Sequence, residues 1–140
     1  MKHVKGILAV AVVMYLTLNT MLPVLARVED QLILLDKNQI WSDRYDTYDS
    51  RDNNYSYCTA ACDSVYPESG RDNFSKIQAR ATDPYGSVII NKEYYILNEG
   101  VGDVKMYYDS SLDQNWTMVM FQFRGNSSAS AYAVVDYDGK

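Results

Sequence analysis

Residues 116–124 read Trp-Thr-Met-Val-Met-Phe-Gln-Phe-Arg, and this stretch decides the fold. It contains no glycine or proline, and it is rich in the aromatic and β-branched residues that favour strands. In an extended chain, alternate side chains point to opposite sides. One side then carries Trp116, Met118 and Met120, and the other carries Thr117, Val119, Phe121 and Phe123. Because both sides are largely apolar, we predict a central strand that is covered on both faces.

Strand-like segments and turns alternate around this stretch. Residues 76–82 alternate polar and apolar side chains, as a half-buried strand does. Residues 83–86, Asp-Pro-Tyr-Gly, are typical of a type I turn. Further strands are expected at 104–108 and 129–137, and the segments 87–90 and 93–97 form either two strands of a tight hairpin or one longer strand with a bulge. Five to six short strands without a sustained helical stripe predict an all-β domain over 74–140, a small antiparallel sandwich or barrel.

Residues 27–73 are predicted to form a polar N-terminal arm. Its short apolar segment, residues 32–35, fits either a strand or one helical turn. From 41 to 72 the chain is rich in Asp, Tyr, Ser and Asn, and Val65 is its only Val, Ile or Leu. Such a segment cannot drive its own burial, so we expect a long loop or a partly disordered arm there.

Residues 1–26 are typical of a cleavable secretory signal peptide. Lys2 and Lys5 precede an uncharged apolar run, and a proline and small residues then lead to Ala26. The alternative is an uncleaved membrane anchor over 6–26, because an uncharged helix of that length can cross a hydrocarbon core of roughly 30 Å. We expect cleavage after Ala26 and a secreted, extracellular protein.

Removal of the signal peptide changes the composition of the chain. It takes two of 13 basic residues and none of 18 acidic ones, so the net charge moves from −5 to −7. An acidic chain without a Lys/Arg cluster is a poor ligand for nucleic acid. His3 is the only histidine, so the remaining 114 residues exclude Ser-His-Asp catalysis, Cys-His catalysis and imidazole metal sites. Paired carboxylates remain, but the domain is small for a substrate cleft, and we expect no enzyme activity.

Cys58 and Cys62 are the only cysteines. Outside the cell, an even pair this close in sequence most simply forms a small disulfide loop. The alternative is a disulfide between two chains. A thioredoxin-type redox motif is excluded, because it has two intervening residues and this pair has three.

Asp43, Asp46, Asp49 and Asp52 recur at every third position. In a turn-rich segment their carboxylates could converge on Ca²⁺, which takes six to eight oxygen ligands. Known calcium loops place their acids two apart and include a glycine, and this run has neither feature. We therefore predict a solvated acidic loop, with no metal and no cofactor, and keep the four aspartates as the calcium alternative.

Tyrosine is unusually frequent, with 13 in the whole chain. Tyrosines favour half-buried strand positions and also interaction surfaces, so amphipathic β-sheet and a recognition face for sugars or proteins both fit. The candidate binding surface consists of Tyr94, Tyr95, Tyr107, Tyr108 and Trp116.

Four Asn-x-Ser/Thr motifs begin at Asn54, Asn73, Asn115 and Asn126. In a eukaryotic secretory pathway they would be glycosylation sites on loops, whereas in a bacterial host the motif is usually silent.

Two stretches, EGVGDVKMYYD at 99–109 and FRGNSS at 123–128, lie within the strand-and-turn run from 79 to 137. With the preceding signal peptide, this layout resembles the small exported β-rich proteins of Gram-positive bacteria, including bacteriocin-like ones. The resemblance implies a non-enzymatic, exported role and brings no catalytic or binding motif. The acidic balance departs from the cationic bacteriocins.

The leading functional hypothesis is a secreted, non-catalytic binding protein, bacteriocin-like or associated with the cell envelope. Its partner would be a protein or a cell-envelope glycan, with membrane contact only through 6–26 if the signal stays uncleaved. The alternatives are a glycan hydrolase that uses paired carboxylates and a calcium-stabilised structural surface protein.

Overall fold

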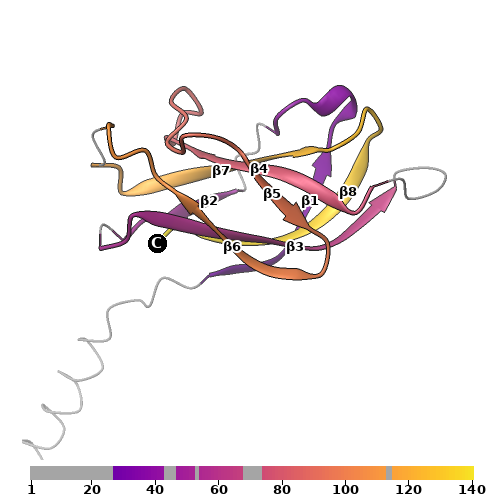
Figure 1. Cartoon of the computed structure of the whole chain (residues 1–140), viewed down its shortest axis with the longest axis horizontal. Coiled ribbons are helices and arrows are strands. Elements are labelled where there is room, and N and C mark those ends of the chain that lie inside the picture. The colour runs from indigo at the N-terminus through magenta and orange to yellow at the C-terminus, as the bar shows by residue number, and fades with distance from the viewer. Residues whose placement is uncertain (1–26, 43–46, 53, 68–73, 113–114) are drawn as a thin grey trace, which may run out of the picture.

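The computed structural model describes residues 27–42, 47–52, 54–67, 74–112 and 115–140 (Figure 1). These residues form eight strands and one 3-10 turn, η1 (Lys37–Gln39). The strands are β1 (Val28–Leu35), β2 (Tyr48–Ser50), β3 (Tyr57–Pro67), β4 (Lys76–Thr82), β5 (Tyr95–Asn98), β6 (Val101–Tyr107), β7 (Met118–Gly125) and β8 (Ala131–Asp138). The all-β prediction is confirmed, but the expected five to six strands are too few. None of the described residues lies in a helix long and apolar enough to cross a membrane.

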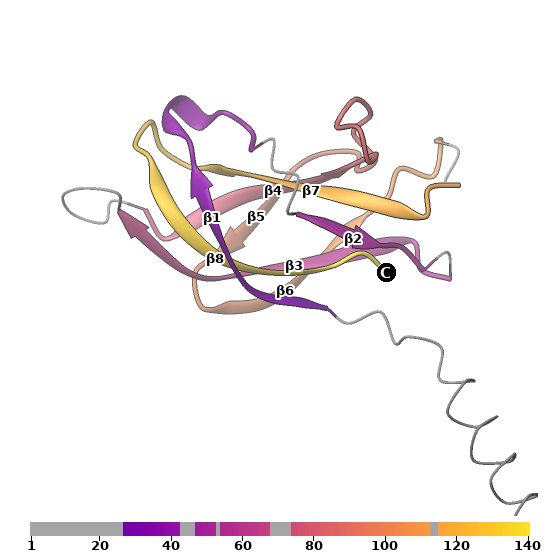
Figure 2. The same cartoon turned by 180° about the vertical axis from the view of Figure 1, so that it is seen from behind.

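The strands form two four-stranded antiparallel sheets (Figures 1 and 2). The first has the order β1-β8-β3-β6 and the second β2-β7-β4-β5. Most neighbours are distant in sequence, because β1 pairs with β8 and β4 pairs with β7. β7, predicted as a central strand, lies between β2 and β4. Its residues 119–123 are all buried, in agreement with the prediction of cover on both faces.

A single apolar core receives side chains from both sheets. The phenyl ring of Phe121 on β7 lies 4.8 Å, centroid to centroid, from the ring of Tyr137 on β8. Alternate residues of β4 and β8 enter the same cluster, and many of them are alanines. Small side chains at these positions leave room for the large aromatic ones opposite, so the core is filled by pairing small with large residues.

The strand β3 corrects the prediction of a long polar loop over 41–72. It is central in its sheet, between β8 and β6, and it is the longest strand. Apart from Val65, its buried residues are small, among them Ala60 and Ala61. The segment therefore has low hydropathy but still fits closely against the core, and β1 and β2 also lie within the expected arm. These three strands account for the underestimated strand count.

The chain passes from one sheet to the other at Gly100. β5 belongs to the second sheet and β6 to the first, and only residues 99 and 100 separate them. Gly100 has a φ of +69°, a left-handed conformation that glycine adopts without steric cost. Its amide donates a hydrogen bond to the carbonyl of Cys62, which joins the corner to β3.

The predicted turn at 83–86 is present, with Gly86 N donating to the carbonyl of Asp83 at 3.0 Å. The Asp83 carboxylate accepts hydrogen bonds from the amides of Ser87 and Val88, at 2.7 and 2.8 Å. These bonds hold the pKa of Asp83 below its usual value, although burial acts in the opposite direction.

Candidate functional site: an arginine–aromatic cluster

The strands β4 and β7 bring two arginines together on the face of their sheet that is turned away from the core. Residues 77, 79 and 81 of β4 and 119, 121 and 123 of β7 enter the core, so the residues between them point outward. The register pairs Gln78 with Arg124 and Arg80 with Gln122. The two arginines are therefore diagonal neighbours on adjacent strands, at a typical separation of about 7–8 Å.

Buried glutamines hold both guanidinium groups in place. Arg80 Nε donates to Gln122 Oε1 at 2.7 Å, and Arg124 Nε donates to Gln78 Oε1 at 2.5 Å. The two glutamines are only 5% and 6% exposed, and Gln78 Nε2 in turn donates to Asn126 Oδ1. These contacts fix the direction in which each guanidinium points.

Aromatic rings lie against the same two guanidinium groups. The Cζ atoms of Arg80 and Arg124 each lie 4.3 Å from the ring centroid of Trp41, and Arg124 Cζ lies 5.2 Å from that of Tyr94. The Trp41 and Tyr94 rings are 6.3 Å apart and tilted by 56°. A guanidinium at this distance from a ring gains about 0.5–2 kcal/mol. We call these four residues the arginine–aromatic cluster.

The positive charge of this cluster is not neutralised within the described part of the chain. No carboxylate there lies within ion-pair distance of Arg80 or Arg124, and the recorded ion pairs involve Arg27 and Lys140 instead. Partial burial, and then the charge of Arg124, lower the pKa of Arg80. With each Nε bonded to a glutamine, the Nη atoms remain available, so the cluster is suited to bind an anionic group.

The five predicted binding residues do not form one surface. Tyr94 belongs to the arginine–aromatic cluster, and Trp116 is half-buried against the core. Tyr108 is inside the protein, 6% exposed, where its hydroxyl donates to the carbonyl of Gly139 and desolvation raises its pKa. Tyr95 and Tyr107 lie together, because the Tyr107 amide donates to the Tyr95 hydroxyl oxygen at 2.9 Å.

Tyr107 also belongs to a second aromatic group, on the other sheet. Its ring lies 5.8 Å from that of Tyr57, its partner across β3 and β6, and Tyr57 lies 5.7 Å from Tyr55. The ammonium of Lys105 lies 4.7 Å from the Tyr57 ring centroid. These rings are tilted by 60° and 72° to one another, so they do not present a flat platform.

The predicted disulfide between Cys58 and Cys62 is wrong. Both cysteines are free and fully buried. They occupy one strand, β3, where residues four apart are separated by roughly 13 Å, beyond the reach of a disulfide. Short sequence spacing favours a disulfide only where the chain turns back on itself. Burial raises the pKa of each thiol to about 12, which keeps both in the unreactive protonated form.

Of the four aspartates in the calcium alternative, Asp43 and Asp46 lie outside the described residues. The other two serve local structure. Asp49 accepts from the amides of Ser50 and Gly139, and Asp52 accepts from the amide and side chain of Asn54. Desolvation raises the pKa of Asp49.

A different acidic group, Asp30, Asp63 and Asp136, has carboxylate oxygens within 4.8 Å of one another. This is the group of described residues that could hold a divalent cation. Arg27 already pairs with Asp136 at 2.5 Å and with Asp103 at 2.6 Å. Partial desolvation, then the charges of Asp136 and Asp30, raise the pKa of Asp63.

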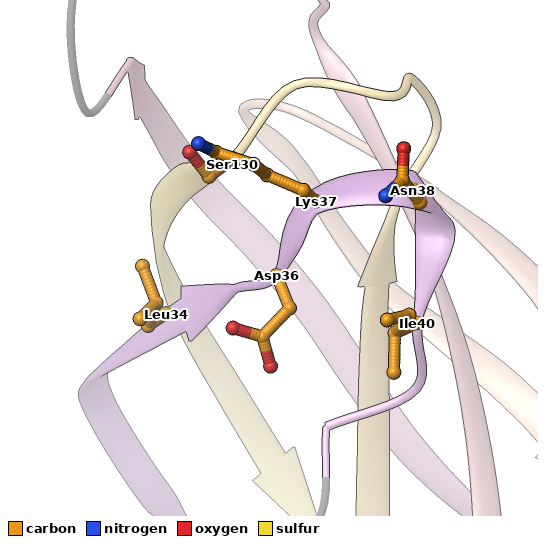
Figure 3. Close-up of a pocket in the computed structure, with 6 residues that line it drawn as sticks. All are labelled: Leu34, Asp36, Lys37, Asn38, Ile40 and Ser130. Carbon is orange, nitrogen blue, oxygen red and sulfur yellow. The ribbon is translucent and has the colours of Figure 1, made fainter.

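An open depression of about 400 Å³ lies beside η1 (Figure 3). The residues that line it are Leu34, Asp36, Lys37, Asn38, Ile40 and Ser130. Its two charged side chains diverge in Figure 3, with Lys37 extending toward Ser130 and away from Asp36. The depression therefore lacks a convergent set of binding groups.

The motifs for glycosylation occupy different environments. Asn54 and Asn115 are exposed, whereas Asn126 is half-buried and its side chain accepts a hydrogen bond from Gln78. Asn73 lies outside the described residues.

No family model matches the chain, and neither a curated protein nor a solved structure is significantly similar to it. The site therefore has to be interpreted from its own geometry. The described residues include no histidine. Fixed donors with unneutralised charge, placed beside exposed aromatic surface, are suited to hold an anionic group.

Sequence reasoning did not find the arginine–aromatic cluster. The alternation over 76–82 already placed Gln78 and Arg80 on the polar face of a strand. The same alternation in 116–124 places Gln122 and Arg124 on one side. What the sequence does not contain is the register that sets these two strands side by side, or the position of Trp41 over them.

Proposed function

We propose that the protein is an exported, non-catalytic binding protein and that the arginine–aromatic cluster contacts its ligand. We take the two sheets to be the layers of a small sandwich that presents this cluster on one outer face. The observation that supports the proposal is the pair of fixed guanidinium groups, Arg80 and Arg124, that no described carboxylate neutralises.

The charge of the whole chain makes this local arrangement informative. A protein with a net charge of −5 repels anions at long range, so the attraction of an anionic ligand has to come from contacts at the cluster. Burial beside the aromatic rings strengthens those contacts, because a guanidinium with less water around it interacts more strongly with an anion. The signal-like segment at 1–26 and the resemblance to small exported β-rich proteins support a location outside the cytoplasm, where a cell-envelope component is the natural partner.

The test is retention of the purified protein on immobilised cell-envelope fractions. We expect the wild type to be retained and the double variant Arg80→Gln/Arg124→Gln to be released. The matched control is Lys92→Gln/Lys105→Gln, which removes two exposed positive charges that are not part of the cluster and should bind like the wild type. Equal retention of the two double variants, or no retention of the wild type, would contradict the proposal.

A further inference from the structure

We propose that the ligand of the arginine–aromatic cluster is a carboxylated polysaccharide, one built with uronic-acid-type sugars. This inference rests on the proposed function and specifies the chemistry of the partner. Three features of the cluster lead to it.

The first feature is the set of donors that each arginine leaves unused. Arg80 Nε and Arg124 Nε are bonded to Gln122 and Gln78, so each guanidinium offers only its terminal Nη pair to a ligand. Two parallel N–H groups from one guanidinium match the two oxygens of a carboxylate. A second arginine on the adjacent strand suits a ligand that carries carboxylates repeatedly, as a polymer of sugar acids does.

The second feature is the apolar surface beside the charges. The Tyr94 side chain is 47% exposed although it lies next to Arg124. Ile96 is 38% exposed and is the cross-strand partner of Gln78, so it lies on the same face of the sheet. A ligand for this surface has to place a face rich in C–H groups next to an anion. A sugar acid carries both on one ring, and a phosphate chain does not.

The third feature is the small number of cations. Polyanions that are recognised by their phosphates require many Lys or Arg residues, and the strength of their binding depends on that number. This acidic protein assembles two guanidinium groups, and both are held rigidly. Two guanidinium groups are enough to recognise a few carboxylates on a sugar chain. Because such a chain is stiff, it loses less entropy on binding than a flexible ligand does.

The experiment measures binding of the purified protein to soluble polymers by isothermal titration calorimetry at physiological ionic strength. The probes are polygalacturonate, its fully methyl-esterified form, poly-glutamate and polyphosphate. We expect polygalacturonate to bind and its neutral ester to bind at least tenfold more weakly, because the ester removes the charge and keeps the sugar chain. Poly-glutamate and polyphosphate should also bind at least tenfold more weakly, because they supply anions without the sugar face.

The variants separate the two parts of the interaction. Arg80→Gln and Arg124→Gln should each weaken polygalacturonate binding about tenfold, since each removes a charge-assisted pair. Arg124→Lys should also weaken polygalacturonate binding, because lysine retains the positive charge but lacks the two parallel N–H donors of a guanidinium. Tyr94→Ala should weaken binding severalfold, and Lys105→Gln should not change it. Thermal melts of each variant confirm that the fold is retained.

Each other outcome has a defined meaning. Equal binding of the methyl ester shows that the carboxylates are not recognised, and equal binding of poly-glutamate or polyphosphate shows recognition of charge alone. Either result overturns the inference. Envelope retention that depends on Arg80 and Arg124, combined with no binding of polygalacturonate, overturns the inference and leaves the proposed function standing. If the wild type is neither retained on the envelope fractions nor bound by polygalacturonate, both the proposed function and the inference fail.

Discussion

Among Gly100, Gly102, Gly125 and Gly139, an added methyl group meets the closest contact at Gly139. A Cβ built on it would lie 2.2 Å from the carbonyl oxygen of Ser50 and 2.9 Å from its carbonyl carbon. Both are backbone atoms of β2, so no side-chain rotation relieves the contact. Either residue 139 or the strand β2 has to move by about an ångström to restore an ordinary van der Waals distance.

That movement would also break hydrogen bonds. The Gly139 amide donates to the Asp49 carboxylate at 2.7 Å, and its carbonyl accepts from the buried Tyr108 hydroxyl. Steric strain of about 1–3 kcal/mol and the loss of a charge-assisted bond of about 1.5–3 kcal/mol overlap rather than add, because one shift causes both. We therefore expect Gly139→Ala to lower the free energy of unfolding by about 2–4 kcal/mol, a large part of the roughly 5–15 kcal/mol of a typical domain.

Urea denaturation followed by tryptophan fluorescence measures this loss as a lower midpoint with an unchanged slope. The control is Gly102→Ala, because a Cβ at Gly102 meets nothing within 4 Å. We expect the control to remain within about 0.5 kcal/mol of the wild type. If Gly139→Ala also remains within that range, the close approach of residue 139 to β2 is not a constraint and the reasoning fails.

Two further predictions concern the cysteines and the acidic group. Cys58 and Cys62 should react with a thiol reagent at pH 8 only after denaturation, and the intact mass should correspond to two free thiols. Rapid labelling of the native protein, or a mass lower by two hydrogens, would contradict the burial of two free thiols. Asp63→Asn should stabilise the protein by a few tenths of a kcal/mol at pH 7. Because the pKa of Asp63 is raised in the folded state, its ionisation lowers the free energy of unfolding as pH rises through that folded-state pKa. The stabilisation by Asp63→Asn should therefore vanish below the unfolded-state pKa of about 3.9, where Asp63 is protonated in both states. Thermal melts at pH 7 and pH 3 test this, and an equal gain at both would refute it.

The sequence predicts best where local pattern and tertiary environment agree. Most of the apolar stretch 116–124 lies in β7, an inner strand of its sheet, because both faces of this strand contribute to burial. The pattern fails at β3, where alanine, threonine and cysteine fill a tightly packed central position without raising the hydropathy. The error in the disulfide follows from the same failure, because an assumed loop allowed Cys58 and Cys62 to approach each other.

The arginine–aromatic cluster could not be predicted for a different reason. Each of its residues has an ordinary local role, and Arg80 and Arg124 become neighbours only through the pairing of β4 with β7. That pairing joins segments about 40 residues apart, and nothing in either strand specifies it. The acidic group at Asp30, Asp63 and Asp136 depends in the same way on the pairing of β8 with β1 and β3.

The position of β8 between β1 and β3 also determines when the chain can fold. Both of those strands are synthesised early, but the strand that joins them consists of residues 131–138. A growing chain that lacks this segment has β1 and β3 unpaired with each other, so the first sheet cannot form until residues 131–138 are available. Pairings this distant in sequence make folding slow, commonly milliseconds to seconds.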